Sequence, residues 1–479
     1  MSRRGKRKLW KMAAIAVGVV VLAGCVSYSI VAKKASSHFA KGTVINGVDV
    51  SGMDIDSLNE RIKEYRIDIR EQTKEGKLVT EVLNGTDFSV KVDTDNKQVK
   101  KILEDQSVWQ YISKAGKEHT VSGWLRYDKK KLLRLINQLQ CFDASFCQKP
   151  VNAYISEYTW ENGYRIVSEN NGNTLDKKKA RNAIVNAVSA MEKTVNLKKE
   201  DCYKEAKVKS DNTKLKKALK KLNRYVSVSI QYRFGDDLVN VDGEQIAKWL
   251  TVTEDNAVLF DRSKVAEFVA ELRKKYDTIF RSRPFRTSYG ENITIPGGDY
   301  GWWMNYDQET TELIEQIRKG KSGERKPVYH QEAESYGKKD YGNSYIEVNL
   351  TKQHAFLYID GEMVWESDCV TGNSSRHFDT PVGVYGITYK EKNAVLVGQG
   401  YQSKVTYWMP FNGNIGLHDA PWRKGEFGGD IYKTRGSHGC VNLPPKKAKE
   451  LFSLVKKGMP VICYKSPGKE KNKKKGKTF

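Results

Sequence analysis

The sequence predicts a multidomain protein with a single N-terminal transmembrane helix, an α+β middle region and a mainly-β C-terminal domain. Three observations predict this fold class. The chain of 479 residues is longer than one ordinary domain. Residues 12–32 carry no charged side chain, and roughly 20 apolar residues are enough for a helix to cross a bilayer core. Beyond residue 343, apolar and polar residues alternate as they do in strands, and Asp360-Gly361 is typical of a hairpin turn.

The uncharged run 12–32 follows a basic segment, residues 1–11, which we expect to stay in the cytoplasm by the positive-inside rule. The run is longer than the core of a usual signal peptide and has no clear small-x-small cleavage site, so we expect an uncleaved, single-pass anchor in the cell membrane. Leu22-Ala23-Gly24-Cys25 resembles the lipobox of bacterial lipoproteins, which makes a lipoprotein anchored at Cys25 the alternative. Either anchor places the body of the chain outside the cytoplasm.

The chain is strongly basic, with 82 Lys and Arg against 58 Asp and Glu and a formal net charge of +24. Such a charge suits a polyanionic partner, and anionic wall polymers fit an extracytoplasmic protein. The sequence has no zinc-finger spacing or RNA-binding motif and its basic residues are spread out, so we expect no nucleic-acid partner. The seven cysteines form no CxxC pair, and we expect no metal and no cofactor. Spacing alone leaves open whether Cys141 and Cys147 form a disulfide.

The middle of the chain mixes strand and helix patterns. Residues 43–50 alternate like a strand, and residues 51–66 have the spacing of a capped helix. A similar series returns later, with a strand over residues 226–232 and an amphipathic helix over residues 263–276. The repeated series indicates an α+β region that divides into two related modules.

Composition divides the chain into segments. A polar, glycine-containing stretch separates the α+β region from the strand-rich one, and the last residues are rich in lysine and poor in apolar groups. The predicted segments are 1–11 (cytoplasmic), 12–32 (anchor), 41–285 (α+β region), 286–342 (connecting segment), 343–465 (mainly-β domain) and 466–479 (basic, disordered tail).

Residues that can carry chemistry are concentrated between His418 and Asn442. They occur in the runs Gly416-Leu417-His418-Asp419-Ala420-Pro421-Trp422 and Thr434-Arg435-Gly436-Ser437-His438-Gly439-Cys440-Val441-Asn442. A cysteine nucleophile needs an imidazole that holds it as a thiolate and passes protons, and backbone N–H groups that receive an oxyanion. Cys440 lies next to glycines that permit the tight turn such N–H groups require. Zinc held by His418, His438 and Cys440 would use the same residue types, but their spacing matches no familiar zinc site.

These runs resemble the motif of the L,D-transpeptidase (YkuD-like) family, which is a His, a spacer and then Ser/Thr-His-Gly-Cys. The resemblance covers about residues 343–465 and implies a YkuD-like β-sandwich. Its upstream pieces are Thr371-Gly372-Asn373 and Thr380-Pro381-Val382-Gly383-Val384-Tyr385. The chain departs from many members at Asn442, where they carry Arg, and the spacer between His418 and Ser437 is slightly long.

The middle region resembles the peptidoglycan-binding region that precedes the catalytic domain in Gram-positive members of this family. The matching pieces are Ile45-Asn46-Gly47-Val48-Asp49-Val50-Ser51-Gly52-Met53, Tyr276-Asp277-Thr278, Phe285-Arg286-Thr287-Ser288, Gly298-Asp299-Tyr300-Gly301-Trp302 and Arg325-Lys326-Pro327-Val328-Tyr329. The resemblance implies peptidoglycan binding. The alternative is a spacer that lifts the catalytic domain through the wall.

The resemblance also implies a role for each residue of the motif. Cys440 attacks the carbonyl of the third residue of a donor stem peptide and expels the terminal D-Ala, leaving a thioester. His418 is the base and acid, oriented by the backbone carbonyl of Asp419. Backbone N–H groups form the oxyanion hole, and they belong to Gly439, Cys440 and His438. The residues implied to line the substrate path are Ser437, Asn442, Trp422, Trp408 and Tyr407.

The resemblance therefore implies an L,D-transpeptidase, a cysteine acyltransferase of cell-wall biogenesis and cell shape that carbapenems inhibit. Its partners are the donor stem peptide and an acceptor stem peptide, whose third-residue amine takes the acyl group. An L,D-carboxypeptidase would use the same residues with water as the acceptor, because the difference lies in how the acceptor site excludes water. A wall-binding protein with an inert catalytic domain is the rival of another class.

Overall fold

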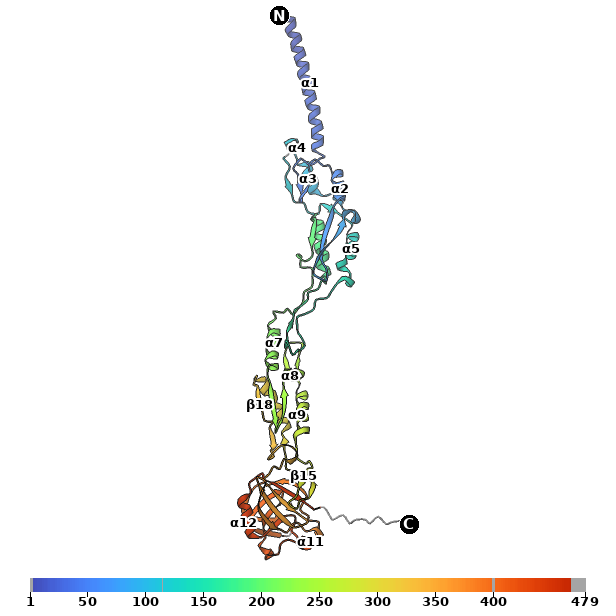
Figure 1. The fold of residues 1–479 in the computed structure, drawn as a ribbon. Coiled ribbons are helices and arrows are strands. Elements are labelled where there is room, and N and C mark those ends of the chain that lie inside the picture. Colours follow the sequence, from blue (N-terminus) through green and yellow to red (C-terminus); the bar gives the residue numbers. More distant parts are fainter. Residues whose placement is uncertain (1–2, 114, 399–400, 467–479) are drawn as a thin grey trace, which may run out of the picture. The chain divides into compact units, whose positions relative to one another are not determined.

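The computed structural model describes residues 3–113, 115–398 and 401–466. The chain forms two compact units (Figure 1), which are Met1–Ser156 with Ile166–Lys216, and Glu157–Arg165 with Lys217–Phe479. Residues 467–479 of the predicted tail and residues 1–2 of the predicted cytoplasmic segment lie outside the described residues.

The first unit begins with the long helix α1 (Arg3–Ala35). Among the residues that the structure describes, α1 is the one helix that is long and apolar enough to cross a membrane, judged by length and composition. The helix contains the predicted span 12–32 and continues beyond it at both ends. Lys33 and Lys34 lie in its last turn, where cations interact favourably with the helix dipole.

The remainder of the first unit consists of short sheets and amphipathic helices around one core. The helix predicted over residues 51–66 is confirmed as α2 (Ile55–Lys63), which begins where the Asp54 side chain accepts a hydrogen bond from the N–H of Ser57. The sheets of the first unit have the strand orders β2-β1-β6, β10-β3-β4, β5-β7 and β8-β9. The other elements are β1 (Val44–Ile45), β2 (Val48–Asp49), β3 (Arg66–Gln72), β4 (Leu78–Asn84), β5 (Lys91–Val92), α3 (Lys97–Glu104), α4 (Val108–Ser113), β6 (Glu118–His119), β7 (Leu125–Arg126), α5 (Lys129–Gln138), β8 (Tyr154–Ile155), β9 (Ile166–Val167), α6 (Lys177–Ser189) and β10 (Thr194–Asn196).

The second unit starts with an α+β module. The predicted helix over residues 263–276 is confirmed as α9 (Arg262–Tyr276). The strand predicted over residues 226–232 is wrong at its start, because α7 (Thr213–Val226) continues to Val226 with apolar residues at helical spacing. The other elements are β11 (Ile230–Phe234), β12 (Asp237–Val241), α8 (Gly243–Lys248), β13 (Leu250–Val252), β14 (Val258–Phe260), β17 (Trp303–Met304), α10 (Tyr306–Arg318), β18 (Gly323–Arg325) and β19 (Tyr329–Gln331).

The predicted connecting segment 286–342 contains regular structure, including α10 and most of the hairpin β15 (Arg283–Arg286) and β16 (Asn292–Ile295). Phe285 and Ile295 of this hairpin share one buried cluster with Val384 and Ile462 of the C-terminal domain. The segment therefore packs against the C-terminal domain as well as joining it to the preceding module.

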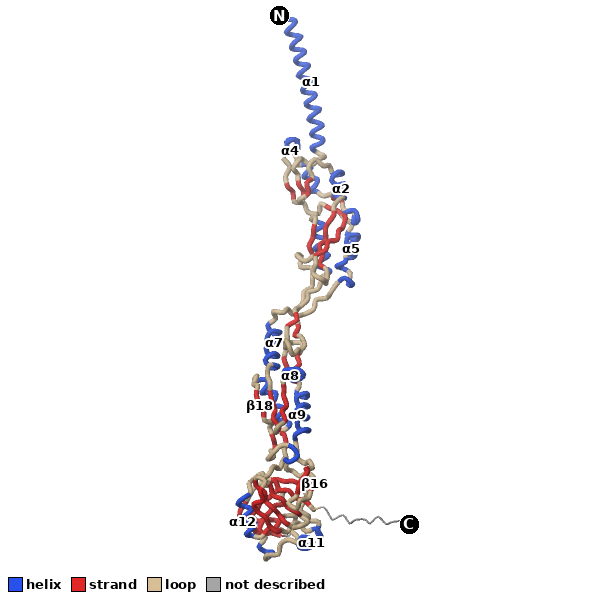
Figure 2. Tube along the Cα trace, viewed as in Figure 1, coloured by secondary structure: helices blue, strands red, loops and turns tan. Residues whose placement is uncertain are grey.

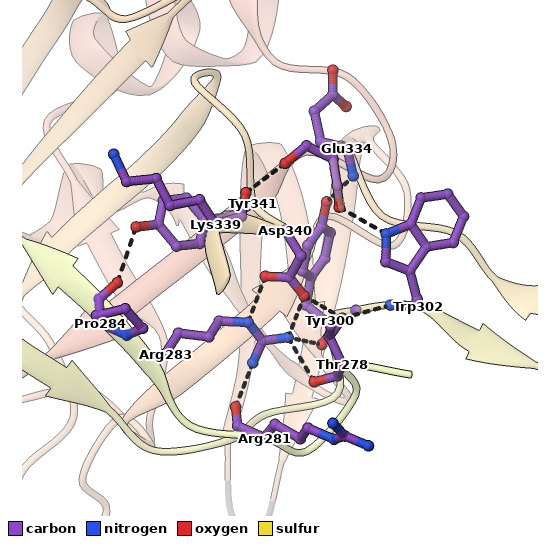
Figure 3. Close-up of polar contacts among 12 residues, drawn as sticks. Thr278, Arg281, Arg283, Pro284, Tyr300, Trp302, Glu334, Lys339, Asp340 and Tyr341 are labelled. Atoms are coloured by element: carbon purple, nitrogen blue, oxygen red, sulfur yellow. Dashed lines mark hydrogen bonds and ion pairs between the residues drawn. The ribbon is translucent and has the colours of Figure 1, made fainter. Parts of the chain in front are cut away.

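A buried ion pair holds this junction together (Figure 3). The Arg283 guanidinium donates to both carboxylate oxygens of Asp340, through Nε at 2.6 Å and a terminal nitrogen at 2.7 Å. Its other hydrogen bonds go to the backbone carbonyls of Thr278, Arg281 and Tyr300. Arg283 is 2% exposed and Asp340 0%. Because both charges are paired and hydrogen-bonded, their burial is tolerated, whereas removal of one partner would be costly.

The C-terminal domain has two sheets around a shared apolar core. Figure 2 shows the strands of this domain gathered in one place. The strand orders of the two sheets are β22-β21-β20-β28-β23 and β24-β25-β26-β27. The hairpin predicted at Asp360-Gly361 is confirmed, and both residues have positive φ, as its tight turn requires. The elements are β20 (Tyr345–Asn349), β21 (His354–Ile359), β22 (Glu362–Asp368), β23 (Gly383–Gly386), β24 (Glu391–Gly398), β25 (Tyr401–Asn412), β26 (Ile415–Asp419), α11 (Ile431–Arg435), β27 (Val441–Leu443), α12 (Pro445–Leu454) and β28 (Pro460–Tyr464).

Candidate active site

Strand register brings three of the predicted site residues side by side. Trp408 of β25 pairs with His418 of β26, and His418 pairs with Asn442 of β27. Residues in register on neighbouring strands project from the same face of a sheet. The His418 ring accordingly lies 5.8 Å from the Trp408 ring, centroid to centroid, and contacts the Asn442 amide.

His418 is buried and both ring nitrogens have partners. Nδ1 lies 2.8 Å from the backbone carbonyl oxygen of Asp419, and Nε2 lies 2.9 Å from the amide nitrogen of Asn442. The carboxylate of Asp419 points elsewhere and accepts the backbone N–H groups of Thr406 and Tyr407 at 2.8 and 2.7 Å. The orienting group beside the imidazole is thus the carbonyl and not the carboxylate.

Arg423 extends the hydrogen-bond network around His418, although the family motif did not predict it as a site residue. Its Nε donates to the amide oxygen of Asn442 at 2.8 Å, and a terminal nitrogen donates to the carbonyl of Arg435 at 3.0 Å. Asn442, predicted to line the substrate path, therefore also bridges Arg423 and His418. The contact could not be read from sequence, because nineteen positions separate Arg423 from its amide partner.

Cys440 lies directly before β27 and is 8% exposed. Its Sγ lies 3.6 Å from the carbonyl oxygen of Asn414. Around it pack Ala394, Val405 and Trp408. The thiol therefore lies in a largely apolar surrounding beside the imidazole face of the sheet.

Burial sets the charge states of both groups. Burial raises the pKa of the Cys440 thiol to about 11, although a backbone hydrogen bond from Gly416 opposes the shift. Burial lowers the pKa of His418 to about 4, although the hydrogen bond to Asp419 opposes the shift. Loss of hydration penalises both charged forms, so burial opposes a thiolate–imidazolium pair in the free protein. That the imidazole holds Cys440 as a thiolate stays a prediction.

A tight turn presents the thiol. The Ser437 hydroxyl donates to the carbonyl of Cys440 at 2.6 Å and accepts the N–H of Gly439 at 3.1 Å. Gly439 has φ +117°, a conformation that L side chains rarely adopt, and a Cβ there would lie 3.1 Å from Ile415. The Gly439 N–H, one of the predicted oxyanion donors, is therefore bonded within the turn itself.

The upstream motif segments, residues 371–373 and 380–385, form hydrogen bonds to this turn. The N–H of Ser437 donates to the carbonyl of Thr371, and the N–H of Asn373 donates to the carbonyl of Ser437, each at 2.9 Å. The buried Thr380 hydroxyl donates to the carbonyl of Gly439 at 2.6 Å. A Cβ on Gly372 would lie 1.8 Å from the carbonyl oxygen of Phe378, so only glycine fits there. These residues position Cys440, a role that their distance in sequence concealed.

A cavity of about 230 Å³ opens at this site. Its lining includes His418, Trp422, Ser437, His438, Cys440 and Asn442, together with Leu396, Ser403, Arg423 and Gly436. The Trp422 ring lies 5.9 Å from the His418 ring and is partly exposed, as a lining residue would be.

Two of the aromatic residues predicted to line the substrate path are not among the residues that line this cavity. Trp408 is buried behind Cys440 and His418. Tyr407 packs 5.3 Å from the Phe452 ring, on the core side of the sheet. Alternation along a strand explains this, because Trp408 faces His418 and its neighbour must face the opposite side.

Within the described part of the chain, no group of three or more His, Cys, Asp or Glu residues could hold a metal ion.

The L,D-transpeptidase catalytic domain is the family model that matches residues 343–463, the same residues that form this two-sheet domain and its cavity. A mutant of the Enterococcus faecium L,D-transpeptidase is 34% identical, with 52% of this chain and 100% of that chain covered and a TM-score of 0.44. This chain belongs to the L,D-transpeptidase family. A second family model, for a peptidoglycan binding domain, matches residues 208–325.

Two further comparisons match L,D-transpeptidases to parts of this chain. The catalytic domain of the Enterococcus faecium enzyme acylated by ertapenem is 46% identical, covering 26% of this chain and 98% of that one with a TM-score of 0.24. L,D-transpeptidase 2 of Mycobacterium tuberculosis is 27% identical over 89 residues, which are 19% of this chain. The match spans 20% of the length of that curated relative.

Proposed function

We propose that this L,D-transpeptidase cross-links the third residues of peptidoglycan stem peptides through a thioester on Cys440. The observation that carries the proposal is that Cys440 and His418 line one cavity while Nδ1 of His418 is engaged by the Asp419 carbonyl. That carbonyl accepts the Nδ1 hydrogen, so Nε2 is the basic nitrogen of the ring. A thiol and a correctly oriented base are the parts that acyl transfer requires.

In the first half-reaction, Sγ of Cys440 attacks the carbonyl carbon of the third donor residue. Its proton passes to Nε2 of His418 and displaces the hydrogen bond that the Asn442 amide donates to that nitrogen. The backbone N–H group of Cys440 receives the oxyanion. Collapse breaks the amide bond, and the imidazolium returns the proton to the amine of D-Ala, which leaves. Because burial disfavours the charged form of each group, we expect the proton to move during the attack and not before it.

In the second half-reaction, the side-chain amine of the acceptor's third residue attacks the thioester carbon. His418 takes a proton from this amine, the C–S bond breaks, and Sγ regains the proton. Attack by water in place of the amine would release a tripeptide, which is the L,D-carboxypeptidase outcome.

Two parts of the chain support action at the wall. The length and composition of α1 support a single-pass anchor with the basic residues 3–11 in the cytoplasm and the catalytic domain outside. The match of residues 208–325 to a peptidoglycan binding domain supports contact with the wall polymer by the module that precedes the catalytic domain.

Incubation of the purified full chain with tetrapeptide stems tests the proposal. We expect a cross-linked dimer and free D-Ala, and neither from Cys440→Ala. Tripeptide without dimer would identify a carboxypeptidase. No product from the folded parent protein would favour an inert, wall-binding role.

A carbapenem tests the nucleophile separately. The Enterococcus faecium catalytic domain has been solved acylated by ertapenem, and we expect ertapenem to add once to this chain, at the peptide that contains Cys440. Intact-mass and peptide-mass measurements detect the adduct. An unmodified mass with a folded and reduced protein would contradict the assignment.

A further inference from the structure

The short helix α4 (Val108–Ser113) lies beside the membrane-helix candidate α1. Figure 1 shows α4 next to the end of α1 from which the first unit continues. The two helices are far apart in the sequence, so a specific contact must hold them together.

Gln106 supplies that contact. Its side-chain amide nitrogen donates to the backbone carbonyls of Ala35 and His38, and its amide oxygen accepts the N–H of Ala40 at 2.9 Å. Ala35 is the last residue of α1, where a helix leaves carbonyls without internal partners. Since Gln106 stands two positions before α4, the start of α4 is tied to the end of α1.

The side chains that α4 exposes are large and apolar. Trp109 is 74% exposed and Ile112 54%. Residues three apart lie on the same face of a helix, so these two form one patch. Exposed side chains of this size, gathered on one face, mark an interaction surface more often than isolated ones do.

We propose that Trp109 and Ile112 dip into the outer interface of the bilayer that α1 crosses, so that α4 is a second membrane contact. The proposal rests on the anchor assigned to α1 under the proposed function. Lys33 and Lys34, in the last turn of α1, mark the level where the chain leaves the hydrocarbon. Ala35, which Gln106 holds, is the next residue, so α4 starts at the depth of the lipid headgroups. Tryptophan is enriched at that depth because its ring is amphipathic.

The patch formed by Trp109 and Ile112 contacts lipid, because Gln106 holds the start of α4 at the end of α1. Helix α4 carries no charged residue of its own and exposes apolar side chains, so the contact relies on apolar burial. A zwitterionic bilayer is therefore sufficient. The effect on the enzyme is to restrict how the first unit tilts on the membrane, which a single helix would leave free.

Quenching of tryptophan fluorescence tests the contact. The full chain is reconstituted into phosphatidylcholine nanodiscs with brominated acyl chains, and the emission lost to bromine is compared among the parent, Trp109→Phe, Trp160→Phe and Trp10→Phe. Trp160 is also 74% exposed but belongs to the unit without α1, and it is the matched control. Trp10 lies on α1 and reports the anchor itself.

We expect Trp109→Phe to remove a quenchable component of the emission and Trp160→Phe to remove an unquenched one. Ile112→Glu should abolish most of the quenching of Trp109. Quenching of Trp10 without quenching of Trp109 would overturn the α4 contact and leave the anchor intact. If Trp10 is unquenched and alkaline carbonate releases the chain from membranes, the anchor fails, and the α4 contact fails with it.

Discussion

The side-chain amide nitrogen of Asn442 lies 2.9 Å from Nε2 of His418. The oxygen of the same amide accepts a hydrogen bond from Nε of Arg423 at 2.8 Å. An arginine can only donate, so this bond turns the amide NH₂ group toward the histidine. Nε2 must then accept, and Nδ1 carries the hydrogen that goes to the Asp419 carbonyl. Arg423 thus favours the histidine tautomer with its lone pair on Nε2, the nitrogen to which the proposed mechanism assigns the Cys440 proton.

Replacement of Arg423 should therefore impair the chemical step. We expect Arg423→Ala to lower kcat roughly tenfold, or about 1.4 kcal/mol in activation free energy, with little change in KM. Arg423→Lys should restore part of the loss, because lysine also only donates hydrogen bonds. Stem-peptide turnover gives both constants, and ¹⁵N NMR of the imidazole reports the tautomer. Lys433→Ala, an exposed neighbour in α11, is the control. An unchanged kcat and an unchanged tautomer in Arg423→Ala would contradict the role of Arg423 in setting the His418 tautomer.

The two catalytic side chains should be separable from the fold. We expect Cys440→Ala to abolish turnover and His418→Ala to impair it severely, because each removes one partner in proton transfer. Thermal unfolding should show that Cys440→Ala retains a cooperative transition. Substantial turnover by Cys440→Ala would contradict the assignment of Cys440 as the nucleophile. Acylation of His418→Ala at the parental rate would contradict the assignment of His418 as the base.

The pH dependence of acylation follows from the two shifted pKa values. The pKa of His418 is lowered to about 4, so the imidazole is neutral and able to accept a proton above that pH. The pKa of Cys440 is raised to about 11, so thiolate forms only near that pH. We expect the rate of ertapenem acylation to fall as pH drops through about 4 and to stay level from there toward neutrality. Thiolate absorbance that appears in the neutral range, absent from Cys440→Ala, would show a preformed ion pair instead.

The junction between the α+β module and the catalytic domain should depend on its buried ion pair. We expect Asp340→Ala to lower the free energy of unfolding by about 3–5 kcal/mol, because the Arg283 charge would remain buried without its partner. Chemical denaturation measures the loss. The exposed pair of Arg233 and Glu324 is the control, and Glu324→Ala should cost about 0–1 kcal/mol. Equal losses in the two variants would show that burial of the pair is not what matters.

Sequence reasoning was most successful where the deciding residues are neighbours. The hairpin at Asp360-Gly361 and the helix α9 (Arg262–Tyr276) were predicted because turn type and helical period are local properties. Prediction was less successful where a helix pattern and a strand pattern compete within one segment. Val226 has strand-forming character, but the apolar repeat of the preceding helix carries α7 through it.

The sequence by itself determined which residues can carry chemistry, because the order of His418, Ser437, His438, Gly439 and Cys440 is the motif of the family. It also determined the long uncharged run near the N-terminus. Both are properties of residue type and order along the chain.

Only the tertiary structure decided how those residues are used. It placed Arg423 on Asn442, turned Tyr407 into the core, and bonded the Gly439 N–H to Ser437. It also buried Cys440 and His418, which disfavours the charged form of each. The physical reason is that hydrogen-bond partners, the face of a strand and the loss of hydration depend on which segments meet in space, and spacing along the chain does not specify that.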